Sequence, residues 1–461
     1  MARASEPHDP LLRFLGRDEP SRRTITKGRA EPVEHPLPEQ LPLRPSRVLR
    51  NLGPGLVTGA SDADPGGIGT YSQAGSQFGY GFLWTALFTY PLMLAVQEMC
   101  GRVGLQTGVG LGKVLRARFS VWLVAPCIAA LVIANVFNAG ADLGAVAAGL
   151  NLLIGDRVPA RILVIVIGTG LLVAQVFLRY SRVASVFKWL TLALFAYLIA
   201  IVFARPNASQ VLTHTFVPNI EFSRDYIADL VAIFGTTITP YLFFWQASAE
   251  VEHEQAEGKT NPALRRAAAG PRRLRWSRLD IVAGTLLAQL VMYGILLTSG
   301  AVLHEHGVTN IQSAAEAASS LKPLAGSYAS VVFAIGIIGA GLLAVPILVA
   351  SATYAVKEFA GWGGSLGTRA RYRPTFYLVL GACMVIAIVL NFLGLNPIHF
   401  LVLSAAVNGV VAPPLLVLIT LSASDRKLMR GRPSGPVSKT VCWIAVAVMS
   451  AAAAALLITI F

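Results

Sequence analysis

A carboxylate stands at an interruption of the first long apolar segment, in the run Asp64-Pro65-Gly66-Gly67. Proline lacks a helical donor and glycine adds no stiffness, so we expect the helix to unwind briefly beside Asp64. The sixth apolar segment is interrupted in the same way at Thr239-Pro240-Tyr241. Unwound backbone inside a membrane is tolerated where it lines a cavity, and two matching broken helices indicate the substrate site of a secondary transporter. The carboxylate indicates a cation as the cargo.

Oxygen donors surround both interruptions. We expect Asp64 to bind the cation directly, whereas Asp62 could either take part in binding or line an aqueous vestibule. Thr236, Thr237 and Thr239 precede the second proline, and their hydroxyls either face the cation or bond back to their own helix. The site has no cysteine, methionine or histidine nearby in the sequence. Such a site favours hard ions, namely Mg²⁺, Mn²⁺ or Ca²⁺.

Further polar side chains fall within other apolar segments, where an ionisable group is costly and indicates function by default. Asn135, Asn138 and Asp142 are spaced i, i+3 and i+7, which places them on one face of a helix. They form either a hydrogen-bond network between helices or a hydrated path for ions. Asn408, in the tenth segment, could add an amide oxygen to the cation site.

Acidic residues also occur near the ends of apolar segments. Glu98 lies one turn before Arg102 and is expected to pair with it. Glu250, Glu252 and Glu254 follow the sixth segment at the expected cytoplasmic mouth. We expect these three glutamates to form a solvated face, and the alternative is an acidic exit for cations.

The composition is that of a membrane protein. Charged residues make up 13% of the chain and hydrophobic residues 54%, with a mean hydropathy of +0.61, whereas soluble domains have about 25% charged residues. The net charge of +14 comes from basic residues in the loops and the N-terminal tail, as expected for membrane topology, and no nucleic-acid-binding module accompanies it. Neither a nucleophile–base pair nor a phosphate-binding loop is present, so we expect no enzyme and no cofactor.

Apolar stretches of about 20 residues, long enough to cross a bilayer, predict eleven membrane spans. They lie near 53–75, 82–101, 121–148, 159–178, 184–204, 226–248, 280–303, 326–356, 374–393, 397–421 and 439–460. Basic residues concentrate in the connections after the even-numbered spans, which predicts a cytoplasmic N-terminus and an outer C-terminus in the cytoplasmic membrane.

Two halves of five spans each begin with a broken helix, and an odd number inverts the second half relative to the first. The sequence therefore predicts a disordered tail over 1–47, a ten-helix inverted-repeat core over 48–421, and a cytoplasmic loop with a peripheral eleventh helix over 422–461. The connection from His304 to Ala325 is amphipathic enough to form a short external helix.

The first span resembles that of the Nramp divalent-metal transporters. The similarity runs from Gly53-Pro54-Gly55 through Asp64-Pro65-Gly66 to Gln73-Ala74-Gly75-Ser76-Gln77-Phe78-Gly79-Tyr80, and the span pattern extends it over about 48–461. The resemblance implies a LeuT-like fold, in which broken helices 1 and 6 bind the substrate, and transport of Mn²⁺ or Fe²⁺ with protons. It also implies that Asp64 binds the metal and that Thr236 contributes its backbone carbonyl.

This chain departs from the Nramp pattern at the expected metal ligands and along the expected proton path. Gly67 replaces the asparagine of Asp-Pro-Gly-Asn, and Thr239-Pro240-Tyr241 replaces Met-Pro-His. Gln246 replaces a histidine of span six, Ala145 replaces the glutamate that follows Asp142 in the family, and span nine lacks the family's arginines. The chain thus resembles the Nramp-related magnesium transporter branch, also through Leu-Ala-Val-Pro at 343–346. That resemblance implies Mg²⁺ and Mn²⁺ uptake, a wider pocket for a partly hydrated ion, and no proton coupling.

The sequence therefore predicts an α-helical Mg²⁺ transporter, with Mn²⁺ as a second substrate. The predicted site comprises Asp64, Gly67, Thr236, Thr239 and Asn408. One alternative is a proton-coupled Mn²⁺ or Fe²⁺ transporter. Others are an amino-acid transporter of the same fold, and a transport-dead receptor that uses the basic 249–279 loop for docking. The lipid bilayer and the divalent ion are the expected partners, and the sequence does not predict an oligomeric state.

Overall fold

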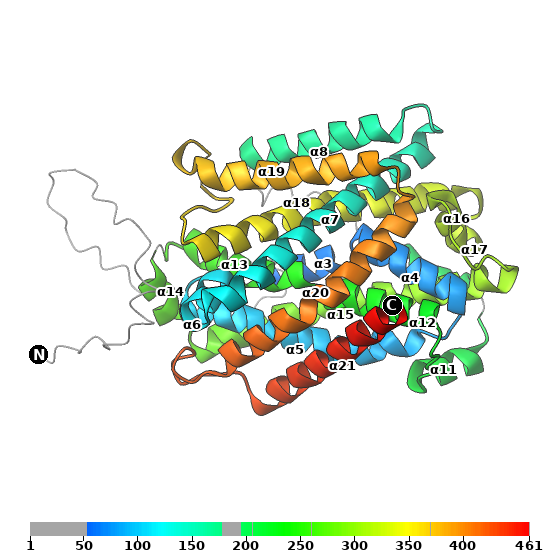
Figure 1. Ribbon diagram of the computed structural model, residues 1–461. Helices are drawn as coiled ribbons and strands as arrows, with labels where there is room; N and C mark the ends of the chain where they lie inside the picture. Colours follow the sequence, from blue (N-terminus) through cyan, green and yellow to red (C-terminus); the bar gives the residue numbers. More distant parts are fainter. Residues whose placement is uncertain (1–52, 178–194, 205, 260, 369, 461) are drawn as a thin grey trace, which may run out of the picture.

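The computed structural model describes residues 53–177, 195–204, 206–259, 261–368 and 370–460, and these fold into helices and connecting loops without a strand. The predicted tail over 1–47 and most of the predicted fifth span lie outside the described residues. The long helices lie side by side along one common direction (Figure 1).

The helices of the bundle follow the predicted spans. They are α3 (Pro54–Asp62), α4 (Pro65–Phe78), α5 (Leu83–Thr107), α7 (Val121–Ile154), α8 (Ala160–Phe177), α10 (Ala196–Ala204), α12 (Arg224–Thr237), α13 (Pro240–Ala256), α15 (Pro271–Val302), α18 (Ala329–Ala360), α19 (Pro374–Leu390), α20 (Pro397–Ser424) and α21 (Pro436–Ile460). In the described part of the chain, 8 helical stretches are long and apolar enough to cross a membrane. The count of eleven spans stays a prediction, because α3, α4 and α5 do not meet this criterion and the fifth span is described only in part.

The two broken helices run antiparallel to each other. The first consists of α3 and α4 and the second of α12 and α13, and α3 packs against α13 while α4 packs against α12. This pairing places the two breaks opposite each other. α7 and α20 pack against each other and against α4. The breaks are thereby enclosed in the centre of the bundle.

Glycine pairs allow the broken helices to approach their neighbours closely. A Cβ atom at Gly59 of α3 would overlap the backbone of Gly284 in α15, and one at Gly235 of α12 would overlap the backbone of Gly409 in α20. Small residues at such contacts are the usual means of helix packing in membranes. Asp280 of α15 further accepts hydrogen bonds from the first backbone amides of α3, at 2.6 Å from the nitrogen of Gly55. The first half of this broken helix, α3, is therefore docked along α15.

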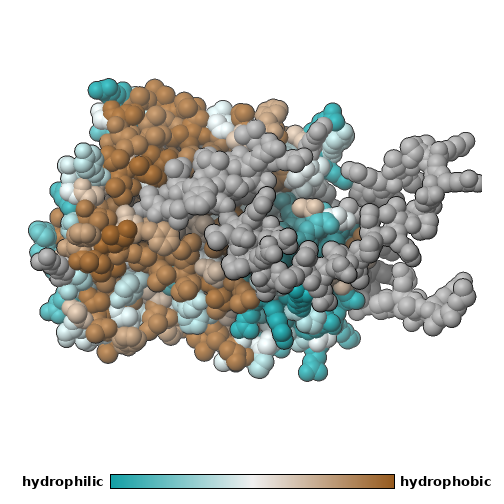
Figure 2. Space-filling model, turned by 180° about the vertical axis from the view of Figure 1, so that it is seen from behind, coloured by the Kyte–Doolittle hydropathy of each residue, from teal (hydrophilic) through white to brown (hydrophobic). Residues whose placement is uncertain are grey.

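Short helices occupy the connections. The predicted helical connection from His304 to Ala325 is confirmed as helical, since it contains a 3-10 turn at His304–His306, α16 (Ala314–Ala318), a 3-10 turn at Ser319–Leu321 and α17 (Lys322–Ala325). The helices α6 (Leu111–Arg118), α11 (Ala208–Phe216) and α14 (Pro262–Ala268) were not expected from the sequence. Apolar residues cover the middle of the face shown in Figure 2, and hydrophilic ones gather toward its two ends. This distribution is that of a protein surrounded by lipid.

Candidate cation site

The first break consists of two non-helical residues between α3 and α4. Ala63 is the C-cap of α3, and Asp64 is the N-cap of α4, whose first residue is Pro65. The Asp64 Oδ1 atom accepts a hydrogen bond of 2.6 Å from the backbone nitrogen of Gly67. Proline is favoured at the first helical position because no hydrogen bond is lost there, and aspartate is among the best N-caps. The local sequence therefore fixes a buried carboxylate at the break.

The other carboxylate oxygen of Asp64 faces two neighbouring helices. The amide of Asn138 in α7 donates to Oδ2 over 3.3 Å, and the hydroxyl of Tyr241 in α13 lies 3.4 Å from it. The same hydroxyl donates a stronger bond of 2.7 Å to the carbonyl of Ser61, in the last turn of α3. Tyr241 thus joins the two broken helices across the site.

The second break likewise separates two helices by two residues. Thr239 is the N-cap of α13, but its side chain makes no capping bond and its hydroxyl has no partner among the described residues. The Thr237 hydroxyl bonds back to the carbonyl of Ile233 over 2.7 Å and lies 3.1 Å from the hydroxyl of Tyr71 in α4. Thr236 lies in the last turn of α12, where a helix leaves its carbonyls without intrahelical partners. Of the three threonines, Thr237 therefore bonds back to its own helix, which was the alternative to facing the cation.

The polar face of α7 forms hydrogen bonds between helices. Asn138 accepts a hydrogen bond of 2.9 Å from the hydroxyl of Ser404 in α20. The Asp142 Oδ1 atom accepts one of 3.1 Å from the backbone nitrogen of Gly66. Asn135 donates over 3.4 Å to the carbonyl of Leu348 in α18. These contacts support the network interpretation of this face, and they place α7 directly against the first break.

Several buried oxygen atoms in these elements have no hydrogen-bond partner within the described chain. They include Asp62 Oδ1, Asp142 Oδ2, Thr239 Oγ1 and Asn408 Oδ1. Unpartnered buried polar atoms are costly, so bound ions or waters are the usual explanation. Asn408 precedes Gly409, whose backbone touches Gly235 of α12. In the described part of the chain, no hydrogen bond joins Asn408 to Asp64. The structure thus brings Asp64 and Gly67 together and leaves Asn408 beside the second broken helix.

Two tyrosines of the site were missed as partners from the sequence. Tyr241 directly follows the second break proline, and Tyr71 lies one turn after Gly67. Their positions next to the two motifs were the available signal, because both rings are carried by the broken helices themselves.

The prediction of a solvated face at Glu250, Glu252 and Glu254 is wrong. Glu250 and Glu254 are 0% and 1% exposed. Arg273 at the start of α15 binds both, at 3.0 Å from Glu250 and 2.7 Å from Glu254, and Lys259 also reaches Glu254 at 2.5 Å. A basic segment distant in sequence therefore neutralises these acids and closes over them.

The remaining acids of this end are paired as well. Glu252 accepts hydrogen bonds from the hydroxyl of Tyr354 in α18 and from the backbone nitrogen of Leu366. The predicted pair of Glu98 with Arg102 is confirmed at 2.5 Å. The contacts of Glu252 join α13 to other elements at this end of the bundle, whereas the pair of Glu98 with Arg102 lies within α5.

Gln246 connects the acidic cluster to α3. Its Oε1 atom accepts a hydrogen bond of 2.6 Å from the hydroxyl of Thr58, and its Nε2 atom donates one of 3.3 Å to Glu250. Gln246 is fully buried. An amide that does not titrate thus stands between the first broken helix and the nearest buried acid of α13.

This arrangement can bind a cation through oxygen atoms. The hydrogen-bond partners of Asp64 in the described chain are a backbone amide, an asparagine and a tyrosine. The same part of the chain has no group of three or more histidines, cysteines and acids that could hold a metal ion. One carboxylate with few additional protein ligands suits an ion that keeps part of its water shell.

Broken helices that face each other across a buried carboxylate, inside an antiparallel bundle, define a membrane transporter of the LeuT-like class and not an enzyme. Residues 55–459 match the family described as Natural resistance-associated macrophage protein-like. The chain therefore belongs to the Nramp family.

Known proteins similar to this chain agree with that assignment. A divalent metal cation transporter MntH of Aeromonas hydrophila is 26% identical over 410 residues, which are 87% of this chain and 93% of the relative. Another of Caldanaerobacter subterraneus is 24% identical and covers 85% of this chain and 89% of its own length.

Solved structures share the fold. A manganese transporter of Eremococcus coleocola has a TM-score of 0.70 at 17% identity, over 90% of this chain and 88% of the other. MHP1, a nucleobase-cation-symport-1 family transporter, has a TM-score of 0.54 at 13% identity, over 88% of this chain and 91% of the other.

Proposed function

We propose that this protein transports Mg²⁺ across the membrane, with Mn²⁺ as a second substrate. The observation that carries the proposal is the Asp64 carboxylate, held at the break between two half-helices among oxygen and amide groups. Relatives named as divalent metal cation transporters support a divalent ion as the cargo. Asp64 supplies the charge, and Thr236, Thr239 and Asn408 bind the ion or its waters.

The chemistry of the donors favours Mg²⁺ over softer ions. Mg²⁺ releases its waters reluctantly and is commonly held by one or two carboxylates plus water, whereas a sulfur ligand favours transition metals. Glycine at 67 contributes no side chain, and Thr239 contributes a hydroxyl whose oxygen lacks a partner among the described residues. Both features leave space and oxygen atoms for a partly hydrated ion. Mn²⁺ uptake with protons is the second candidate, favoured by the structural similarity to a manganese transporter.

We further propose that transport proceeds by alternating access without proton coupling. Gln246 and Ala145 cannot titrate, and α19 contains no charged residue over Pro374–Leu390. Asp142 remains in the site, but its Oδ1 atom is bound to the backbone of Gly66. Basic loops at one end support a cytoplasmic N-terminus and an outer C-terminus in the cytoplasmic membrane.

Uptake by the purified protein in liposomes tests the proposal. Mg²⁺, Mn²⁺, Fe²⁺ and a set of amino acids would be offered separately, with protein-free liposomes as the control. We expect uptake of Mg²⁺ and Mn²⁺ above the control, and no uptake of amino acids. Amino-acid uptake alone would assign the site to an anionic group, and absence of any uptake would favour a receptor.

A further inference from the structure

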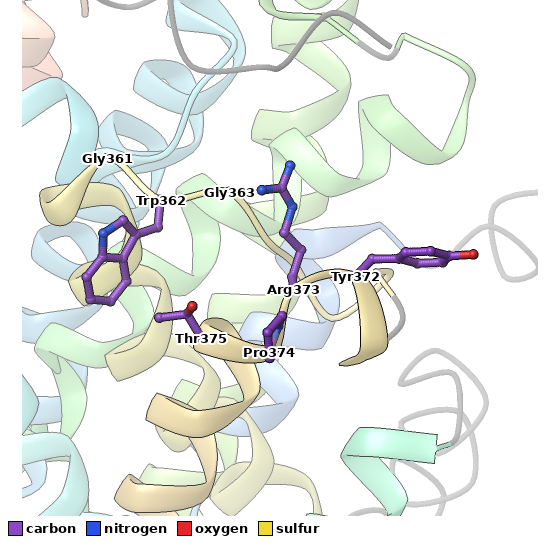
Figure 3. A pocket seen from close by; sticks show the side chains of 7 residues that line it. All are labelled: Gly361, Trp362, Gly363, Tyr372, Arg373, Pro374 and Thr375. Atoms are coloured by element: carbon purple, nitrogen blue, oxygen red, sulfur yellow. The ribbon is translucent and has the colours of Figure 1, made fainter. Parts of the chain in front are cut away.

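A pocket distant from the breaks lies at the start of α19. It has a volume of about 350 Å³ and is lined by Gly361, Trp362, Gly363, Tyr372, Arg373, Pro374 and Thr375. Figure 3 shows Trp362 and Arg373 on opposite sides of the hollow, with Thr375 between them. The apolar stretch long enough to span the membrane begins at Pro374, directly after Arg373. The pocket therefore lies at a boundary between membrane and water.

The pocket has the chemistry of an anion site. Within the described chain, the guanidinium of Arg373 has neither a carboxylate partner nor a hydrogen bond, and it rests against the backbone of Gly363. Pro374 has no N–H, but the backbone amides that follow it begin α19 at the same place, where a helix of 17 residues leaves its first amides free and favours negative charge. The exposed hydroxyl of Thr375 adds a further donor. A planar guanidinium with adjacent N–H and O–H donors matches a phosphate group.

An exposed apolar face of α19 begins at this pocket. Thr375 is followed on the same side of the helix by exposed residues at spacings of three and four, namely Leu378, Ala382, Val385, Ile386 and Val389. Leu378 is 73% exposed and Val389 is 56% exposed. Spacings of three and four place these side chains in one row along the helix. A molecule with its charged group in the pocket can thus extend an apolar chain along α19.

Aromatic residues flank the pocket in the manner of a membrane interface. Trp362 is 46% exposed and Tyr372 is 62% exposed, and amphipathic rings of this kind lie at the level of lipid headgroups. We propose that this pocket binds the phosphate of an anionic phospholipid, with an acyl chain along the exposed face of α19. The occupant is a lipid and not free phosphate, because the donors and the apolar row are continuous. This site is independent of the cation site.

Native mass spectrometry of the detergent-purified protein tests this proposal. Phosphatidylglycerol and phosphatidylcholine would be titrated onto the wild type and onto Arg373→Gln. We expect the variant to lose affinity for phosphatidylglycerol by about fivefold to tenfold, the effect of one basic residue at an anionic lipid surface. Binding of phosphatidylcholine should change by less than about twofold, because a zwitterionic headgroup gains little from one positive charge.

Arg371→Gln is the matched control. Arg371 lies two residues away, is exposed, and bonds the Tyr372 hydroxyl at 2.6 Å without lining the pocket. Its removal should leave phosphatidylglycerol binding within about twofold of the wild type, and both variants should unfold at the wild-type temperature. Equal losses in the two variants would show general attraction to basic loops and overturn the assignment. Full competition by inorganic phosphate would show an anion site for solutes, and would also overturn it.

Discussion

Asp64 combines two roles that substitution can separate. Its Oδ1 atom caps α4 through the amide of Gly67, and its negative charge is the proposed counter-charge for the cation. Asparagine caps helices about as well as aspartate does, but it has no charge. Alanine removes both the cap and the charge. A comparison of the two variants therefore tells binding apart from local folding.

We expect both Asp64→Asn and Asp64→Ala to abolish Mg²⁺ and Mn²⁺ uptake in liposomes. Only alanine should lower stability, by about 1 kcal/mol, because it alone removes the N-cap. Thermal unfolding in detergent measures the second effect on the same preparations. Near-normal uptake by Asp64→Asn would mean that Asp62 or Asp142 supplies the charge instead.

Ion preference should depend on Gly67 and Thr239. The double variant Gly67→Asn, Thr239→Met adds an amide and a soft sulfur ligand, so Mn²⁺ or Cd²⁺ binding should strengthen relative to Mg²⁺ by about tenfold, or about 1.4 kcal/mol. A Cβ at Gly67 would lie 3.1 Å from the ring of Tyr71, which must move slightly to admit it. Calorimetric titration of each ion measures the ratio. An unchanged order of preference would mean that the wider shape of the pocket sets selectivity.

At the scale of helices, the second half of the second broken helix, α13, is held by charges from α15. Arg273 bridges Glu250 and Glu254, which lie one turn apart on α13, and Ser277 adds a bond of 2.5 Å to Glu250. Through Gln246 the same cluster reaches Thr58 of α3. The half-helices α13 and α3 are thereby both attached to α15, the first by this cluster and the second by Asp280.

Arg273→Ala should destabilise the protein by about 3 kcal/mol, because it leaves the buried Glu250 carboxylate without its ionic partner. The neighbouring Arg272 is exposed, so Arg272→Ala removes the same charge and should leave the unfolding temperature unchanged. Thermal unfolding of the two variants in the same detergent measures the difference. If both variants unfolded at the wild-type temperature, the cluster would not hold α13 in place.

Much of the helical framework could be predicted because its signals are local. The breaks fall at Asp64 and Thr239 as expected, since each proline removes a donor within the segment that contains it. The positions of the apolar segments follow from hydropathy, but not all of their limits: α15 begins at Pro271 and not near 280, and α7 ends at Ile154 and not near 148. Short helices such as α6 and α14 have too few residues for a periodic pattern.

The partners within the candidate site could not be predicted in the same way. The contact of Tyr241 with Asp64 joins residues 177 positions apart, and no periodicity reports such a distance. Burial of Glu250 and Glu254 depends on Arg273, which the sequence shows only as one of many basic residues in a loop. The pairing of Glu98 with Arg102 was predictable because it lies within one turn.

At the scale of the whole molecule, an uncoupled carrier has a distinct electrical signature. We expect Mg²⁺ entry into liposomes without acidification of the lumen and with little dependence on a pH gradient. Each ion would move two charges, so the driving force should change by about 4.6 kcal/mol per 100 mV of membrane potential. A potassium diffusion potential set by valinomycin, with a pH-sensitive dye inside, measures both. Metal-dependent acidification at a fixed stoichiometry would return the protein to the proton-coupled class.

The contact between α3 and α15 limits how fast such a carrier can work. Gly59 and Gly284 touch through their backbones while Asp280 holds the first amides of α3, so this half-helix cannot yield by small side-chain motions. In the proposed alternating access this segment would move as a unit, and motions of that kind take microseconds to milliseconds. Throughput is then bounded at about 10³ to 10⁶ cycles per second. By the proposed mechanism the ions would cross one cycle at a time, at a pace set by a moving helix and not by diffusion along an open pore.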